Sequence, residues 1–67
     1  MKIKFIKDVT VDVIDSADED AHDRLMRQGV SLDCVEVSPV SRGFSNLILD
    51  SGKVLVDVRN DCFTQEP

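Results

Sequence analysis

The sequence has few of the residues on which binding pockets and catalytic sites usually depend. It contains no Trp or Tyr, and only three Phe, two Cys and one His among 67 residues. No apolar run approaches the roughly 20 residues of a membrane helix, or the roughly seven of a signal-peptide core. We therefore expect a cytoplasmic protein that does not bind membranes. With so few aromatic residues, Val, Ile and Leu must form most of the core, and β-branched residues favour strands.

Basic residues are also scarce. Eight Lys and Arg stand against 13 Asp and Glu, which gives a formal net charge of −5. Binding to phosphate groups needs clustered cations that displace condensed counterions, whereas these cations are scattered. The composition predicts no direct nucleic-acid binding and favours a protein partner with a basic surface. We expect a monomer or a weak homo-oligomer.

The length predicts a single domain over residues 1–67. A chain this short buries only about 60% of its unfolded surface, which leaves little room for a deep active site. The lone His22 has no nucleophile and orienting partner arranged around it. Cys34 and Cys62, together with His22, do not complete a tetrahedral zinc site, and we expect both cysteines to be free thiols buried as small apolar side chains. The protein is predicted to be no enzyme and to hold no metal or cofactor.

Alternating apolar and polar residues predict strands along most of the chain. Residues 3–14 alternate as one half-buried strand, which a break near Lys7 and Asp8 would divide. Residues 44–49 and 53–58 form a hairpin around the turn 50–52, and 62–65 form a short last strand. The side chains predicted to be largely buried are Phe5, Val11, Leu32, Leu47, Val56 and Phe63.

Residues 30–37 alternate in two phases. Val30, Leu32 and Cys34 share one phase, whereas Val35 and Val37 share the other. A change of phase inside a strand predicts a bulge or a sharp bend, which small barrels use to close. Residues 38–43 are then predicted to be a loop, because Pro39 has no N–H to donate to a ladder.

Two interpretations compete for residues 15–28. Ser16 and Glu19 fit a capping box, and Gly29 would end the resulting helix. Against a helix, its apolar stripe would consist of little more than Ala17, Ala21 and Leu25, and a short helix needs packing to be stable. We favour a long loop with at most one short helical turn, whose acidic part, residues 15–23, is expected to be the most mobile part of the chain.

The order of these elements resembles that of Src-homology-3 (SH3) domains. Residues 23–35 are similar to the diverging-turn segment of that family, in which a large apolar residue, polar residues and a Gly precede an alternating strand. The matching residues are Met26, Arg27, Gln28, Gly29, Leu32 and Cys34. Residues 58–63 are similar to the short helical turn before the family's last strand. The resemblance implies a mainly β fold, a small five-stranded SH3-like barrel.

The resemblance implies an interaction module but not the family's usual ligand. SH3 domains hold proline-rich segments in grooves made by Tyr, Trp and Pro side chains. This chain has no Tyr or Trp, and Arg59 and Cys62 occupy the positions of the family's Pro and Tyr at the late turn. In size and acidity the chain also resembles small proteins encoded by phages and prophages.

Acidic residues supply the main candidate binding site. Asp18, Glu19, Asp20 and Asp23 are concentrated on one excursion, and a calcium loop is disfavoured because Ala17 and Asp20 stand where that motif needs an oxygen ligand and a Gly. Arg42 and Phe44 form a second candidate, since Arg and aromatic residues are common interface anchors. The leading hypothesis is a non-enzymatic protein–protein interaction module that binds a basic surface through an acidic loop. The alternative is a phage-type anti-host or nucleic-acid-mimic protein.

Overall fold

The computed structural model describes residues 1–14 and 22–66, and these residues form seven strands and one short 3-10 helix. The strands are β1 (Lys2–Phe5), β2 (Val9–Ile14), β3 (His22–Met26), β4 (Ser31–Ser41), β5 (Phe44–Leu49), β6 (Val54–Arg59) and β7 (Phe63–Glu66). The 3-10 helix η1 (Asn60–Cys62) precedes β7. The chain is therefore mainly β, as its alternating pattern predicts.

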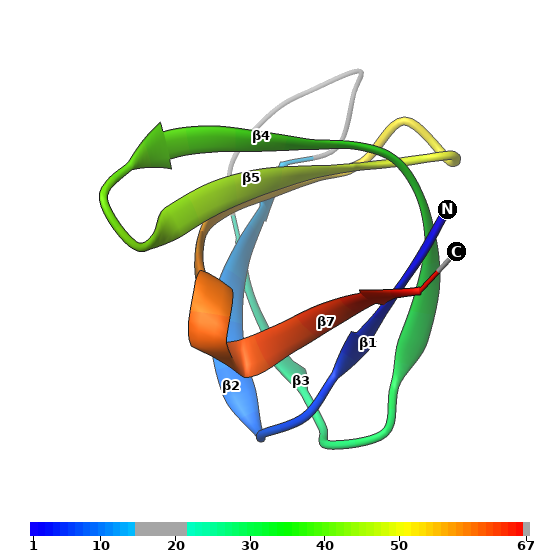
Figure 1. The fold of residues 1–67 in the computed structure, drawn as a ribbon, viewed down its shortest axis with the longest axis vertical. Helices are drawn as coiled ribbons and strands as arrows, with labels where there is room; N and C mark the ends of the chain where they lie inside the picture. Colours follow the sequence, from blue (N-terminus) through cyan, green and yellow to red (C-terminus); the bar gives the residue numbers. More distant parts are fainter. Residues whose placement is uncertain (15–21, 67) are drawn as a thin grey trace.

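All seven strands belong to one antiparallel sheet in the order β3-β2-β6-β5-β4-β1-β7. The sheet curls on itself into a half-barrel (Figure 1). The first and last strands pair with each other, with Lys2 opposite Glu66 and Phe5 opposite Phe63. This pairing brings both ends of the chain to the same side of the molecule (Figure 1).

The predicted count of five strands is wrong. The first alternating block is two strands, because the chain turns at residues 6–8 and β2 leaves β1 to pair with β6. The other additional strand is β3, which occupies part of the segment predicted to be a loop and pairs with β2 from Val9↔Met26 to Val13↔His22. Residues 22–28 contain no helix, since the hydrogen bonds of β3 are made across to β2; the rest of the 15–28 prediction lies outside the described residues.

The predicted bulge in the fourth strand is confirmed. The β4–β5 register shifts between Cys34 and Glu36, at Val35, where the alternation changes phase. Residues 31–33 of β4 pair with β1, and β4 pairs with β5 from Cys34 onward, so the bulge lies where the strand passes from one half of the sheet to the other. The predicted loop at 38–43 is wrong in extent, since β4 continues to Ser41. Pro39 is tolerated because this half of β4 has a partner strand on one side only and a second register shift follows it.

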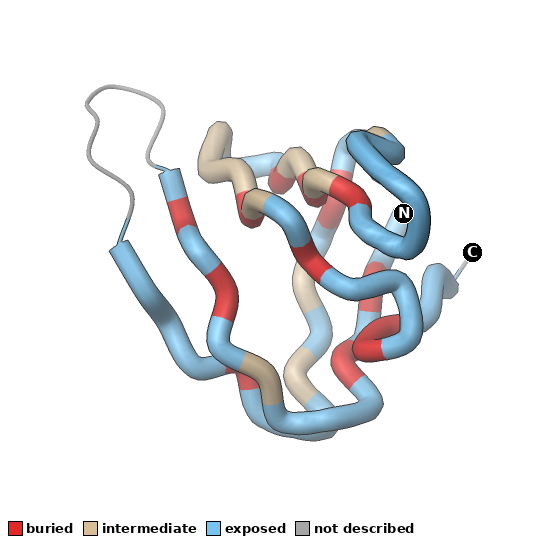
Figure 2. Tube along the Cα trace, turned by 90° about the vertical axis from the view of Figure 1, so that its left-hand side faces the viewer, coloured by how far each residue is buried: buried red, intermediate tan, exposed pale blue. Residues whose placement is uncertain are grey.

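The core fills the inside of the curled sheet. Phe5, Val11, Leu47 and Phe63 are buried as predicted, whereas Leu32 and Val56 are only partly buried. The alternating red segments along β1, β2 and β5 in Figure 2 mark the strand faces that point inward. The remaining buried apolar side chains are Ile3, Val13, Met26, Cys34, Leu49, Leu55, Val58 and Cys62, and both cysteines are free thiols.

Candidate functional site

Three carboxylates lie close together on the solvent-facing side of β2, β3 and β6. Asp12 is directly opposite Asp23 across the β2–β3 ladder. On its other side Asp12 is opposite Val56, and Asp57 follows Val56 in β6. All three side chains are exposed. We call Asp12, Asp23 and Asp57 the acidic face.

The surroundings of Asp12 disfavour ionisation of its carboxyl group. The pKa of Asp12 is raised from its ordinary value of 3.8, first because its carboxyl shares a hydrogen bond with that of Asp23, which requires a proton. Partial desolvation and the negative charges of Asp23 and Asp57 raise the pKa of Asp12 further. An approaching Lys or Arg would relieve this repulsion, so the arrangement suits a cationic partner.

Asp57 has a backbone conformation that is unusual for a strand. Its φ of 53° makes it the one non-Gly residue with positive φ among residues 1–14 and 22–66. Its N–H donates to Asn46 Oδ1 at 3.0 Å, and the β5–β6 register shifts at the same place, between Ser45 and Leu47. This local irregularity places Asp57 on the acidic face.

Of the four acidic residues predicted to bind a partner, only Asp23 lies within the described part of the chain. Asp18, Glu19 and Asp20 lie outside the described residues. Asp23 lies in strand β3 rather than in a loop. Sequence reasoning did not select Asp12 or Asp57, because only the β2–β3 and β2–β6 pairings bring them next to Asp23. The alternation of residues 9–14 alone indicated that Asp12 would face solvent.

Arg42 and Phe44 lie on either side of Gly43 in the turn between β4 and β5. Gly43 has a φ of +83°, which an L-residue adopts only under strain, and its carbonyl accepts a hydrogen bond from Asn60 N–H at 2.9 Å. The turn and η1 enclose a shallow groove of about 330 Å³, lined by Arg42, Gly43, Phe44, Arg59, Asn60 and Asp61. Phe44 is 37% exposed at this groove. Two strands, β2 and β6, separate β5 from β3 in the sheet, so these residues form a site distinct from Asp23.

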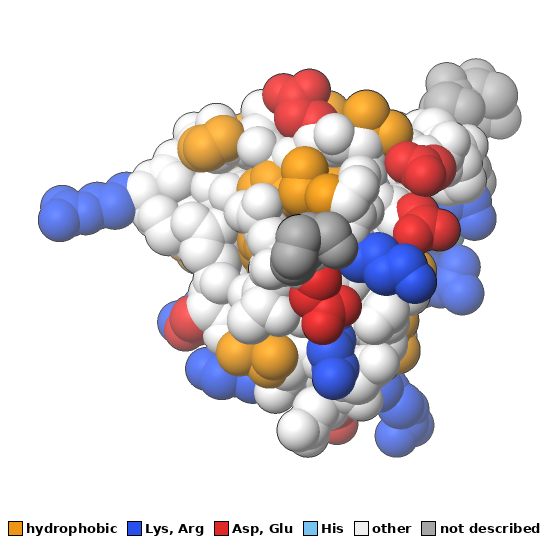
Figure 3. Space-filling model, turned by 45° about the vertical axis from the view of Figure 1, so that its right-hand side comes forward, with side chains coloured by type: hydrophobic (Ala, Val, Ile, Leu, Met, Phe, Trp, Pro, Cys, Tyr) orange, Lys and Arg blue, Asp and Glu red, His pale blue; other side chains and the backbone are white. Residues whose placement is uncertain are grey.

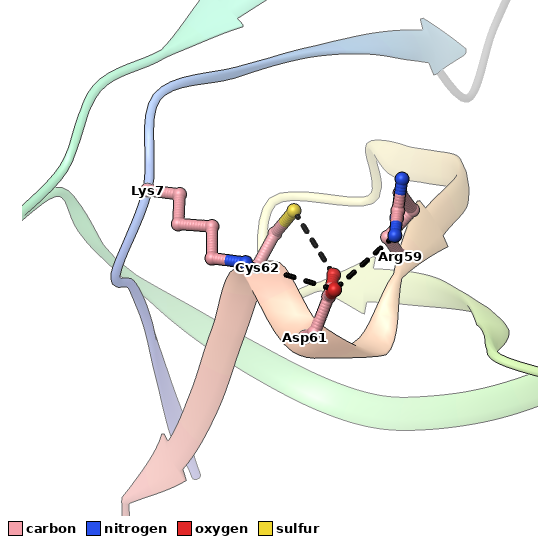
Figure 4. A network of polar contacts seen from close by, with 4 residues as sticks. All are labelled: Lys7, Arg59, Asp61 and Cys62. Carbon is pink, nitrogen blue, oxygen red and sulfur yellow. Dashed lines mark hydrogen bonds and ion pairs between the residues drawn. The ribbon is translucent and has the colours of Figure 1, made fainter.

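A polar network around Asp61 joins η1 to the chain between β1 and β2 (Figure 4). Lys7 Nζ lies 3.6 Å from Asp61 Oδ2, and Arg59 donates to the same oxygen at 3.2 Å. The thiol of Cys62 donates to Asp61 Oδ1 at 3.5 Å. The Cys62 hydrogen bond is the main reason that the pKa of Asp61 is lowered, and the charges of Arg59 and Lys7 lower it further. No pattern in the sequence indicated this network.

The network does not activate its cysteine. Burial raises the pKa of the Cys62 thiol, and the hydrogen bond to Asp61 and the carboxylate charge raise it further. The thiolate is the nucleophilic form, so this environment keeps Cys62 unreactive. The buried hydroxyl of Ser45 likewise has an ordinary partner, since it donates to Asn60 Oδ1 at 2.8 Å.

Both signs of charge occur on the surface. Figure 3 shows acidic and basic side chains next to one another, with small hydrophobic areas between them, on the side of the molecule that carries the two termini. Within residues 1–14 and 22–66, no group of three or more His, Cys, Asp or Glu side chains is arranged to hold a metal ion. In the same part of the chain no helix has the length and hydropathy needed to span a membrane.

No protein-family model matches the chain, and no match to it was found among curated proteins or solved structures.

Proposed function

We propose that this protein is a non-enzymatic protein-interaction module, built on an SH3-like barrel, which binds a basic partner surface through its acidic residues. The partner-binding residues are Asp18, Glu19, Asp20 and Asp23, extended on the described strands by Asp12 and Asp57. Arg42 and Phe44 form a secondary contact.

One observation carries the proposal, the Asp12–Asp23 pair on adjacent strands. Like charges directly opposite each other destabilise an antiparallel sheet. The pKa of Asp12 is raised first by its hydrogen bond with Asp23, and the negative charge of Asp23 adds to this effect. The fold therefore places two like charges next to each other. A partner that supplies Lys or Arg would offset their repulsion, and this would favour binding.

The order of strands supports the SH3-like part of the proposal. The first and last strands pair, a long strand bends at a bulge to join both halves of the sheet, and a 3-10 turn precedes the last strand. On this proposal β1, β4, β5, β6 and β7 are the five strands of the barrel. The strands β2 and β3 then form a hairpin inserted between the first two of them. The aromatic groove for proline-rich ligands is missing, because the chain has no Trp or Tyr. Charge complementarity therefore takes the place of proline recognition.

The alternative proposal is a phage-type anti-host protein whose carboxylates imitate nucleic-acid phosphates and occupy a basic nucleic-acid site. It uses the same acidic residues and differs in the class of partner. Recovery of nucleic-acid enzymes from a lysate favours mimicry, and recovery of other basic proteins favours the interaction module.

The experiment is affinity capture from a bacterial lysate with the immobilised protein and two variants. The first variant carries Asp18→Asn, Glu19→Gln, Asp20→Asn and Asp23→Asn. The matched control removes four acids elsewhere, through Asp33→Asn, Glu36→Gln, Asp50→Asn and Glu66→Gln. Four removed charges change the net charge from −5 to −1 in both variants.

We expect the first variant to lose the captured partner and the control to retain it. Equal loss in both variants would show that net charge, rather than this group of acids, drives capture. Retention by the first variant would overturn the proposal and direct attention to Arg42 and Phe44.

A further inference from the structure

A cleft of about 310 Å³ opens between β3 and the beginning of β4. Its apolar floor is the edge of the core, including Val13, Leu49 and Leu55, which are at most 9% exposed. Its walls are residues 24–26 on one side and Val30 and Leu32 on the other, and Ser51 and Lys53 of the β5–β6 turn lie at its mouth. We call this cleft the seam, because it lies where the curled sheet remains open.

The seam follows the free edge of a strand. Among the described strands β3 pairs only with β2, so its other edge has no ladder partner. Arg24, Leu25 and Met26 all line the seam, although consecutive residues of a strand point to opposite faces. The seam therefore runs along the backbone edge of β3 rather than over one face. Figure 2 shows β3 as an almost wholly exposed outer strand beside β2.

The charge of the seam is opposite to that of the whole protein. Arg24 and Lys53 line it, and no Asp or Glu among the described residues does. Neither cation takes part in an ion pair within residues 1–14 and 22–66. In a chain of net charge −5, a cleft with two cations and an apolar floor is complementary to a ligand that combines an apolar group with a carboxylate.

Leu25 is the most exposed apolar residue along the seam. It is 51% exposed although it lies within β3. A segment added to the edge of β3 would cover part of Leu25 on one face and reach the apolar floor on the other. Strand addition supplies affinity through backbone hydrogen bonds and specificity through alternate side chains.

We propose that the seam binds an extended peptide segment of a partner protein that carries an apolar residue next to an Asp or Glu. The segment pairs with the free edge of β3, its apolar side chain enters the cleft above Val13 and Leu55, and its carboxylate lies near Arg24 and Lys53. This site is separate from the acidic face and does not depend on its function. The protein would then have two binding surfaces of opposite charge preference.

The test is an NMR titration of the full-length ¹⁵N-labelled protein with the probe peptide Ac-TVDLTV-NH₂. We expect saturable shift changes of the backbone amides of Leu25, Met26 and Leu32, together with slower hydrogen exchange along β3. The control peptide Ac-TVNLTV-NH₂ removes only the negative charge, and we expect about fivefold to tenfold weaker binding from the loss of two exposed charge contacts.

Two protein variants with the same change of net charge distinguish contacts with the cations of the seam from the effect of net charge on peptide binding. We expect Arg24→Gln with Lys53→Gln to weaken binding of the aspartate peptide by the same factor and to leave the asparagine peptide unaffected. The matched control, Lys2→Gln with Lys4→Gln, removes two exposed cations that do not line the seam and should bind as the wild type does. A folded spectrum of each variant before titration confirms that the fold is retained.

Four results of the peptide titrations and their controls would overturn the proposal. The first two are the absence of saturable shifts up to the solubility limit of the peptide, and shifts that lie at the Arg42–Phe44 groove instead of the seam. The third is equal weakening of binding by both pairs of substitutions. The fourth is saturable binding of sodium octanoate, a small apolar carboxylate, but of neither peptide. Shifts of β3 amides that depend on protein concentration alone would assign the seam to a second copy of this chain and would also overturn it.

Discussion

At the scale of single residues, Asp57 combines two features that seldom occur together in a strand. Its backbone has positive φ, and its carboxylate adds to the negative charge around Asp12. Asp and Asn tolerate this backbone region better than other non-Gly residues, and β-branched residues tolerate it worst. Both the positive φ of the backbone and the negative charge of the surrounding surface therefore bear on which residue stands at position 57.

We expect Asp57→Val to destabilise the protein by about 1–2 kcal/mol, the cost of a left-handed backbone conformation for an L-residue. Asp57→Gly should remain within about 0.5 kcal/mol of the wild type, because lost strain offsets the greater entropy of the unfolded chain. The side chain is exposed, so neither change alters the core. Urea unfolding measures both, and equal stability of the Val variant and the wild type would contradict the φ assignment.

A second prediction at this scale concerns Asp12 and the dependence of stability on pH. A carboxyl whose pKa is raised in the folded state binds its proton more tightly there than in the unfolded chain. The contribution of Asp12 to the free energy of unfolding therefore increases as the pH falls through its raised pKa. The increase is complete near pH 3.8, the pKa of this carboxyl in the unfolded chain. Below that value the opposite effect of Asp61 applies, because its lowered pKa gives stability that is lost as pH falls further.

We expect the wild type to become more stable as the pH falls from neutrality toward about 4, and Asp12→Asn to lack most of this increase. Asp33→Asn changes the net charge equally and should keep the wild-type dependence. Chemical denaturation at a series of pH values measures the effect. A parallel dependence in the wild type and Asp12→Asn would show that the Asp12–Asp23 pair does not influence stability.

At the scale of elements, the bulge at Val35 controls which faces of β4 meet the core. Before it Cys34 is buried and after it the inward-facing phase changes, with Val37 partly buried. Val35 itself is 62% exposed, so its side chain contributes little to packing. The backbone of this residue matters more than its side chain.

Deletion of Val35 removes the extra residue of the bulge, so Cys34↔Leu49 and Glu36↔Ile48 become consecutive pairs and the following side chains keep their faces. The strand loses its bend, and we expect this loss to destabilise the protein by about 1–3 kcal/mol, because residues 31–33 must then strain to keep their pairing with β1. Val35→Ala keeps the bulge and should cost less than about 0.5 kcal/mol, as an exposed substitution does. Thermal unfolding of the two variants makes the comparison. Similar melting temperatures would mean that the bend at Val35 is not needed to join the two halves of the sheet.

The elements that sequence predicted best are those with local signals. Alternation located β5 and β6 to within a residue, it covered β1 and β2 in one block, and the change of phase at Val35 located the bulge. β3 was missed because four of its five residues are exposed and its pattern is not alternating. Its strand conformation depends on pairing with β2, and that information is not local.

The candidate site was only partly predictable for the same reason. The concentration of acids near Asp23 is visible in the sequence, but the contribution of Asp12 and Asp57 arises from strand order. The Asp61 network joins Lys7 to residues 59–62, and only the pairing of the first and last strands brings them together. The seam was missed because it depends on an edge strand that the sequence did not reveal.

At the scale of the whole molecule, the chain distributes its charges unevenly over a small curled sheet. The acidic face lies on β2, β3 and β6, and the cations Arg24 and Lys53 lie at the seam. Exposed charges contribute little to folding, but they set the rate and the salt sensitivity of association. We propose that the acidic residues hold a basic partner in this way.

The most direct test is the ionic-strength dependence of the affinity for the captured partner, measured for the wild type, the variant lacking Asp18, Glu19, Asp20 and Asp23, and the charge-matched control. We predict that the affinity of the wild type and the control falls steeply as salt rises, and that the variant binds weakly with a nearly flat dependence. Unchanged affinity of the variant, with the same salt dependence as the wild type, would contradict the account.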